Sequence, residues 1–181
     1  MERFDPIRRI THMSKSRDWQ SRSMAAEDPN CPPDILEKLS RDPDELVRAS
    51  VARNKKTPVS VLNRLAGENN PFINKSILRN PHCPDRILSN IVMSGDITMS
   101  GLKRVVNHPN ASVETLIKLS NSKRDLVAVD FAKEKLETMI RELESSGKVG
   151  EARRIQDMIM LGDFGVSIDP LDITDLGELD L

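Results

Sequence analysis

Aromatic residues are scarce in this sequence. They make up 3% of the 181 residues, with one tryptophan, four phenylalanines and no tyrosine. A buried core must therefore be aliphatic. No apolar run approaches the roughly 20 residues that a membrane-spanning helix needs, and the first residues contain no apolar stretch of the kind found in secretory signals. These absences predict a cytoplasmic protein without membrane association.

Cysteine is also scarce, and two residues are too few for a disulfide scaffold. Cys31 and Cys83 lie two periods apart in the 26-residue repeat described below, with Thr57 midway. Packed helices lie about 8–10 Å apart, which places the two sulfurs roughly 20 Å from each other. A disulfide needs Cα atoms within about 7 Å, and one metal could not bind both. We interpret both as small core residues in the slot that Thr57 and Ala111 fill elsewhere.

Motifs that carry catalysis are missing as well. The sequence has no glycine-rich phosphate loop, no zinc-ligand spacing and no nucleophile elbow. His12, His82 and His108 are isolated from one another, and the last two fall near turns, where we expect solvated side chains. We therefore predict no enzyme activity, no cofactor, no metal and no small-molecule substrate.

What the sequence does contain is a pattern that returns every 26 residues. Its first three copies begin at Asp28, Asn54 and Asn80, and the fourth begins 28 residues later at His108. A fixed period of this size is typical of a solenoid, in which each repeat buries its apolar face against its neighbours. Solenoids usually act as binding surfaces.

Each repeat contains two short apolar stripes with helical spacing. First helices are predicted over 46–52, 72–78 and 102–106, ending at asparagines that we expect in the left-handed conformation. Second helices are predicted to start at Pro32/Pro33, Pro58, Pro84 or Ser112, because proline suits a first helical turn. Thr57 and Ser112 are expected to cap two of them.

The flanks complete the domain plan. Residues 21–28 read as the last turn of a half repeat, and helices over 126–144 and 149–161 form a C-terminal hairpin that caps the array. The side chains expected to face inward are Val127, Phe131, Leu136, Met139, Ile140 and Leu143 in the first of these helices and Ile155, Met158, Ile159 and Leu161 in the second. The predicted domains are a basic N-terminal segment without clear periodicity (1–18), helical repeats (19–132), capping helices (133–161) and an acidic-hydrophobic tail (162–181). The expected fold is all-α: a short right-handed α-solenoid of about four repeats.

The unit Leu46-Val47-Arg48-x-x-Val51-Ala52-x-Asn54, with Pro58 and then Val61-Leu62-x-x-Leu65-Ala66 after it, resembles the leucine-rich repeat variant family. The resemblance covers residues 20 to about 132, although Ser112 replaces proline in the fourth repeat. It implies an all-helical, HEAT-like solenoid without strands. Some members resemble iron–sulfur proteins through an N-terminal cysteine cluster that this chain lacks, so no cofactor is implied. The family has no common activity, so the resemblance implies a fold and not a function.

Basic residues recur in register. Aligning the repeats superposes Arg53 on Arg79 and Lys75 on Lys103, with further basic residues nearby. Such a ladder suits a phosphate backbone, although solvated surface charge also explains it, and no aromatics are interleaved with it for base stacking. The candidate basic ladder comprises Arg48, Arg53, Lys55, Lys56, Lys75, Arg79, Lys103 and Arg104.

The tail has the opposite charge. Residues 162–181 hold six acidic and no basic side chains, and from Phe164 onward acidic and apolar residues alternate. This composition is typical of a disordered segment that orders on a partner. The last four residues resemble peptides that dock on a sliding clamp, without the usual glutamine and terminal aromatic. The candidate motif is Leu176, Leu179, Asp180 and Leu181; alternatively, the tail packs back on the solenoid.

Together these features predict a non-catalytic protein-binding adaptor or scaffold that acts through its solenoid face and its tail. The partner is another protein of unknown identity. The alternative is a nucleic-acid-associated factor, such as a replication or transcription accessory protein of phage type, recruited by a clamp-binding tail.

Overall fold

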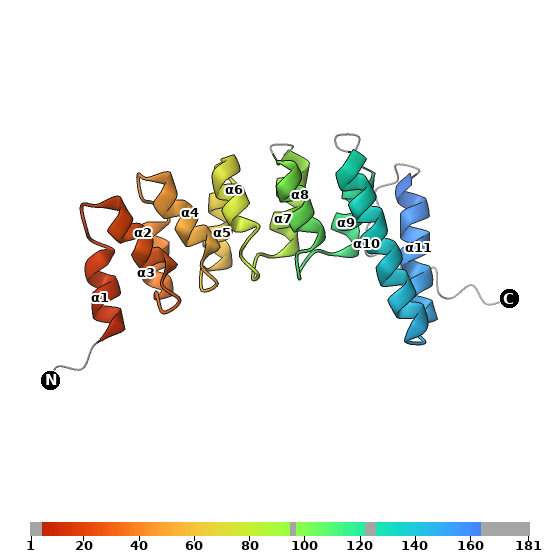
Figure 1. Cartoon of the computed structure of the whole chain (residues 1–181), viewed down its shortest axis with the longest axis horizontal. Coiled ribbons are helices and arrows are strands. Elements are labelled where there is room, and N and C mark those ends of the chain that lie inside the picture. Colours follow the sequence, from red (N-terminus) through yellow and green to blue (C-terminus); the bar gives the residue numbers. More distant parts are fainter. Residues whose placement is uncertain (1–4, 95–96, 122–125, 164–181) are drawn as a thin grey trace. The chain divides into compact units, whose positions relative to one another are not determined.

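The computed structural model describes residues 5–94, 97–121 and 126–163, and within them every regular element is an α-helix (Figure 1). This confirms the all-α prediction. Two compact units are present, Met1–Ala111 and Ser112–Leu181. The helices are α1 (Pro6–Met13), α2 (Trp19–Glu27), α3 (Pro33–Leu39), α4 (Glu45–Arg53), α5 (Val59–Ala66), α6 (Pro71–Ile77), α7 (Asp85–Ser94), α8 (Met99–Val106), α9 (Val113–Ser120), α10 (Leu126–Ser145) and α11 (Val149–Asp163).

In the first unit, helices alternate between two rows, as a helical solenoid requires. The first helices of successive repeats pack side by side, α2 against α4 and α4 against α6, and the second helices α5 and α7 do the same (Figure 1). Leu36, Leu62 and Leu88, which follow one another at intervals of one repeat period, are all fully buried. The core of this unit is therefore the aliphatic stripe that the repeat predicted.

The first helices begin at polar caps in the same register. The side chains of Asp18, Asp44 and Asn70, each separated from the next by one repeat period, accept backbone N–H hydrogen bonds at the starts of α2, α4 and α6. These bonds satisfy donors that the first turn of a helix leaves unpaired. The caps fix where each first helix starts, and therefore which side chains it presents on its outer face.

The second helices follow prolines or a serine. Ser112 caps α9 by accepting a hydrogen bond from the Thr115 N–H at 3.1 Å, as predicted. The prediction for Thr57 was wrong. No side chain caps α5, and the Thr57 hydroxyl donates instead to the Val51 carbonyl at 2.5 Å. Thr57 therefore secures the end of the preceding helix.

The prediction of left-handed asparagines at the helix ends was also wrong, because Asn54 lies at φ −69° and ψ 129°. Asn54 reaches back to the preceding repeat, where its Nδ2 donates to the carbonyls of Ala26 (2.6 Å) and Asp28 (3.0 Å). Asn80 repeats the contact one period later, with the carbonyls of Ala52 (3.0 Å) and Asn54 (2.8 Å). The asparagines thus link adjacent repeats.

His108 takes the place of asparagine in the next repeat. It is buried, and its Nε2 lies 2.9 Å from the Asn80 carbonyl, while its Nδ1 accepts the Asn110 N–H at 3.2 Å. A carbonyl only accepts, so the proton of the neutral ring sits on Nε2. The prediction of a solvated turn histidine was therefore wrong for His108, whereas His82 is exposed.

The second unit contains α9, α10 and α11, which pack on one another. The hairpin turns at Gly147, whose φ of 80° lies in the left-handed region. Val127 and Leu161 were expected to face inward, but their exposed fractions are 47% and 37%. Leu136, Ile140 and Ile155 are buried as expected, and Val129, Ala132 and Ala152 are buried as well.

The N-terminal segment also differs from the sequence prediction. Residues 1–18 show no clear periodicity, yet they include the helix α1, whose Ile10 is fully buried. Arg9 of α1 forms an ion pair with Asp28 at 2.9 Å. The helix α2 is also a full first helix and not only a last turn, because it runs from Trp19 to Glu27.

Candidate functional site

The outer faces of α2, α4 and α6 enclose a hollow of about 280 Å³, here called the first-helix groove. Because the caps of these helices are in the same register, side chains one period apart lie next to each other across the groove. The small residues Ser23, Ala49, Ser50 and Ser76 line it and leave the space open.

Two aromatic side chains line the same groove. Trp19 of α2 and Phe72 of α6 have exposed fractions of 37% and 46%, and Leu46 of α4 adds an apolar contact surface between them. Exposed aromatic side chains provide large apolar contact areas at protein interfaces. The groove therefore offers apolar anchor points within a polar surface.

The charges in the groove are predominantly positive. Among the described residues that line it, the one carboxylate is Glu27, which forms an ion pair with Arg53 and accepts a hydrogen bond from the Ser50 hydroxyl at 3.0 Å. Lys75 and Arg79 line the groove without an ion pair to any described residue. Two cations thus remain available to a ligand with negative charge.

Two further hollows adjoin the first-helix groove and share residues with it. Lys55 and Lys56 line one of them together with Arg53, and Arg104 lines the other together with Arg79. Six of the eight ladder residues therefore border this connected surface: Arg53, Lys55, Lys56, Lys75, Arg79 and Arg104.

Arg48 and Lys103 line none of these three hollows. Arg48 forms an ion pair with Glu68 at 3.1 Å and donates to the carbonyls of Asp42 (2.8 Å) and Pro43 (3.1 Å). Its side chain holds the turn before α4 to the turn after α5. Arg48 therefore has a structural role that its positive charge in the sequence does not reveal.

Sequence reasoning did not include Trp19, Phe72 and Glu27 in this site. Phe72 could have been found, because it shares a first-helix slot with Leu46, one period earlier. The aromatics are not interleaved with the basic residues along the sequence, but folding brings both kinds of side chain into one groove. The tail motif, from Leu176 to Leu181, lies outside the described residues.

The cysteines lie in the core of the first unit. Cys31 and Cys83 are fully buried and free, and burial raises the pKa of the Cys31 thiol to about 11 and that of the Cys83 thiol to about 12. Both thiols therefore stay protonated at neutral pH, which makes them poor nucleophiles and poor metal ligands.

Across 5–94, 97–121 and 126–163, no group of three or more histidine, cysteine, aspartate or glutamate side chains is placed to hold a metal ion. In the same part of the chain, no helix has the length and apolar character needed to cross a membrane.

Comparison with known proteins supports the repeat assignment. Residues 19–44 match the family described as leucine rich repeat variant. This segment contains α2, α3 and the turn that leads to α4. No curated protein and no solved structure gave a significant match. The first repeat of this chain is therefore similar to the leucine rich repeat variant family, as the sequence predicted.

Proposed function

We propose that this protein is a non-catalytic adaptor that binds an acidic segment of another protein in the first-helix groove. Helical repeats of this family are associated with protein interaction in general, which agrees with this proposal. The observation that carries it is the placement of Trp19 and Phe72 in one groove with Lys75 and Arg79.

The proposed ligand follows from the chemistry of the groove. An acidic side chain of the partner pairs with Lys75 or Arg79, and an apolar side chain packs on Phe72 or Trp19. Anchors of this kind dominate the binding energy of many protein interfaces, while charge complementarity increases the association rate. The small floor residues Ala49 and Ser50 allow the partner backbone to approach closely.

A nucleic-acid ligand is the second candidate, favoured by the same aromatic and basic side chains. Single-stranded nucleic acid binds to surfaces that combine stacking platforms with positive charge. The ion pair between Glu27 and Arg53 argues against it, because a carboxylate in the groove repels phosphate while cancelling one of its cations. The overall charge of −1 also contrasts with the basic character of most nucleic-acid-binding domains.

The test compares two probes on the full chain. An acidic peptide of about 12 residues that contains phenylalanine should bind, and its glutamine-substituted analogue should bind more weakly. Phe72→Ala should weaken the peptide complex roughly tenfold, because it removes an aromatic anchor. Arg79→Glu should weaken it further through charge reversal. Arg86→Glu, on the exposed surface of α7 outside the groove, is the matched control and should leave affinity unchanged.

Oligo-dT is the competing probe. If oligo-dT binds more tightly than the peptide, and its affinity falls roughly 10³-fold or more between about 50 and 200 mM salt, the groove belongs to nucleic acid and the protein-segment proposal is wrong. If Phe72→Ala and Arg86→Glu give the same peptide affinity as the parent chain, the groove is not the binding surface.

We also propose that the tail carries a separate binding activity, through Leu176, Leu179, Asp180 and Leu181. Its apolar residues would be buried against a partner such as a sliding clamp, while its acidic residues face outward or meet a basic rim. Deleting residues 175–181 should leave the melting temperature unchanged and abolish one interaction. A drop of several degrees without a lost partner would show that these residues stabilise the fold instead.

A further inference from the structure

One arginine contact recurs with the period of the repeat. Arg22 donates to the carbonyls of Ser16 (3.0 Å) and Arg17 (2.9 Å) and forms an ion pair with Asp42 at 2.6 Å. Arg48, one period later, makes the corresponding contacts with the next turn and with Glu68. Each guanidinium thus fills the space beside a turn and is neutralised by an acid from the turn that follows the second helix of its repeat.

The third repeat lacks this contact. The slot of Arg22 and Arg48 is occupied by Asn74, and the slot of the partner acid by Ser94. Both replacements are shorter and uncharged. At this position the structure has a hollow of about 200 Å³, lined by Asn74, Ser94 and neighbouring residues of α5 and α7. It exceeds the cavity of about 150 Å³ that accommodates benzene in an engineered protein core.

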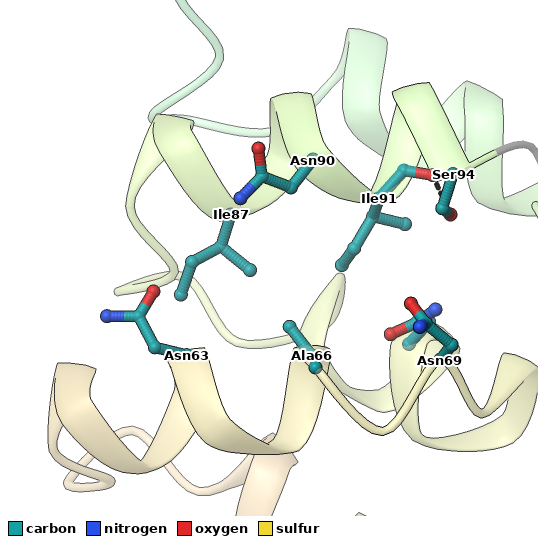
Figure 2. A pocket seen from close by; sticks show the side chains of 9 residues that line it. Asn63, Ala66, Asn69, Ile87, Asn90, Ile91 and Ser94 are labelled. Atoms are coloured by element: carbon teal, nitrogen blue, oxygen red, sulfur yellow. Dashed lines mark hydrogen bonds between the residues drawn. The ribbon is translucent and has the colours of Figure 1, made fainter.

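We call this hollow the asparagine pocket, because Asn63, Asn69, Asn74 and Asn90 all line it. Figure 2 shows Asn63 and Asn69 at its two ends, with Ile87 and Ile91 extending from α7 between them. None of the described residues that line it is charged. The pocket therefore combines carboxamide groups with an apolar wall.

The side chains of these four asparagines form no hydrogen bond to the described residues, whereas Asn54 and Asn80 each bind two carbonyls. Asn74 is the decisive case. Its exposed fraction is 3%, and its buried Oδ1 has no partner among the described residues. A buried acceptor without a donor is costly, and its presence in a native fold calls for an explanation.

We propose that the asparagine pocket binds a carboxamide, supplied by a small primary amide or by a glutamine side chain of a partner. A carboxamide is planar and carries two N–H donors, so it reproduces part of the guanidinium that fills this space in the other repeats. It is neutral, which matches the loss of the acid at Ser94, because burying a cation without a carboxylate is costly. Its carbonyl accepts from the asparagine side chains, and its hydrocarbon part packs on Ile87 and Ile91.

The experiment follows side-chain amide signals of the full ¹⁵N-labelled chain by NMR. Propionamide and a blocked tripeptide with a central glutamine should each shift the signals of the pocket asparagines saturably, and the tighter of the two identifies the source of the carboxamide. Ethylguanidinium and propionate, at matched ionic strength, should cause weaker shifts. Tighter binding of ethylguanidinium would overturn the assignment to a neutral ligand.

Variants test the location. Asn74→Arg combined with Ser94→Asp restores the contact of the other repeats, so it should fill the pocket and abolish propionamide binding. Asn90→Leu, at an exposed position, should weaken propionamide binding roughly two- to tenfold without affecting the fold. This single variant tests the location of the site even if the double variant does not fold. Asn30→Leu, outside the pocket, is the control. If the amide signals shift linearly with propionamide concentration, without saturation, and do so equally in Asn90→Leu, the pocket holds only water and the proposal is wrong.

Discussion

At the scale of single residues, Asn54 and Asn80, which follow the first helices α4 and α6, link adjacent repeats. Asn80 uses one carboxamide nitrogen to bind two carbonyls of the preceding repeat and its oxygen to accept the His82 N–H at 3.0 Å. Asn80 is fully buried, so water cannot replace these bonds. The effect of losing them should therefore be large.

Asn80→Ala is predicted to lower the free energy of unfolding by about 2–4 kcal/mol, because the Ala52 carbonyl loses its side-chain donor and the Asn54 carbonyl keeps only the Thr57 N–H at 3.1 Å. Chemical denaturation measures the change. His108→Asn is the matched control, since it introduces the side chain that this slot carries elsewhere, and it should change stability by less than about 1 kcal/mol. Equal stabilities of Asn80→Ala and the parent chain would contradict the proposed link.

A second residue-scale prediction concerns acid. Burial raises the pKa of Asp42, but hydrogen bonds from Arg22 and from the Asp44 N–H outweigh it and hold that pKa below its ordinary value. Because the folded state lowers this pKa, Asp42 contributes stability above about pH 4, and the contribution disappears as the pH falls through the folded-state value.

Asp42→Asn should therefore be less stable than the parent chain at pH 7, and the difference should shrink as the pH falls below about 4. Melting temperatures measured for both chains from neutral to acidic pH provide the test. A stability difference that does not change with pH would show that the charge of Asp42 has no part in it.

At the scale of helices, the aliphatic stripe could be predicted from the sequence because it depends on spacing alone. The positions of Leu36, Leu62 and Leu88 followed from the repeat period, and all three are fully buried. Helix α1 was not predicted in the same way, because it lies outside the repeats, has only 8 residues and buries a single one of them, Ile10. Val127 was assigned wrongly, because it fits the helical spacing of α10 but is the second residue of that helix and is 47% exposed.

Leu62→Ala should destabilise the protein by about 2–5 kcal/mol, the range for removing a fully buried leucine side chain. Val59→Ala in the same helix provides a control, because Val59 is 47% exposed and should change stability by less than about 0.5 kcal/mol. Thermal unfolding followed by circular dichroism compares the two. A melting temperature that is unchanged in Leu62→Ala would mean that α5 does not face the core as described.

At the scale of the whole molecule, the chain divides into two compact units. The sequence predicted the helices of both, but the groove depends on three helices from successive repeats, and a linear pattern does not show which side chains share a surface. The basic residues could be aligned by period, whereas the pairing of Arg53 with Glu27 and of Arg48 with Glu68 appears only in the folded chain. The charge of a residue in the sequence therefore did not show whether its side chain is available to bind a ligand.

Residues 1–111 should fold without the rest of the chain, because solenoid repeats are stabilised mainly by their nearest neighbours. The fragment is expected to retain helical circular dichroism, a cooperative melting transition and the peptide affinity of the first-helix groove. A fragment that is unfolded at room temperature would show that its stability depends on residues 112–181.

The asparagine links also give the array a direction. The side chains of Asn54 and Asn80 each donate hydrogen bonds to the preceding repeat, and their backbone carbonyls bond to a side chain of the following repeat. Each link therefore has a side-chain donor in one repeat and backbone acceptors in the repeat before it. The residue in the same slot one period before Asn54 is Asp28, whose carboxylate cannot donate a hydrogen bond. It pairs instead with Arg9 of α1. Asp28 therefore ends the series of links. A repeat inserted after Asn80 could form the link with its neighbours, whereas a repeat inserted before Asp28 could not, because the Asp28 side chain offers only hydrogen-bond acceptors.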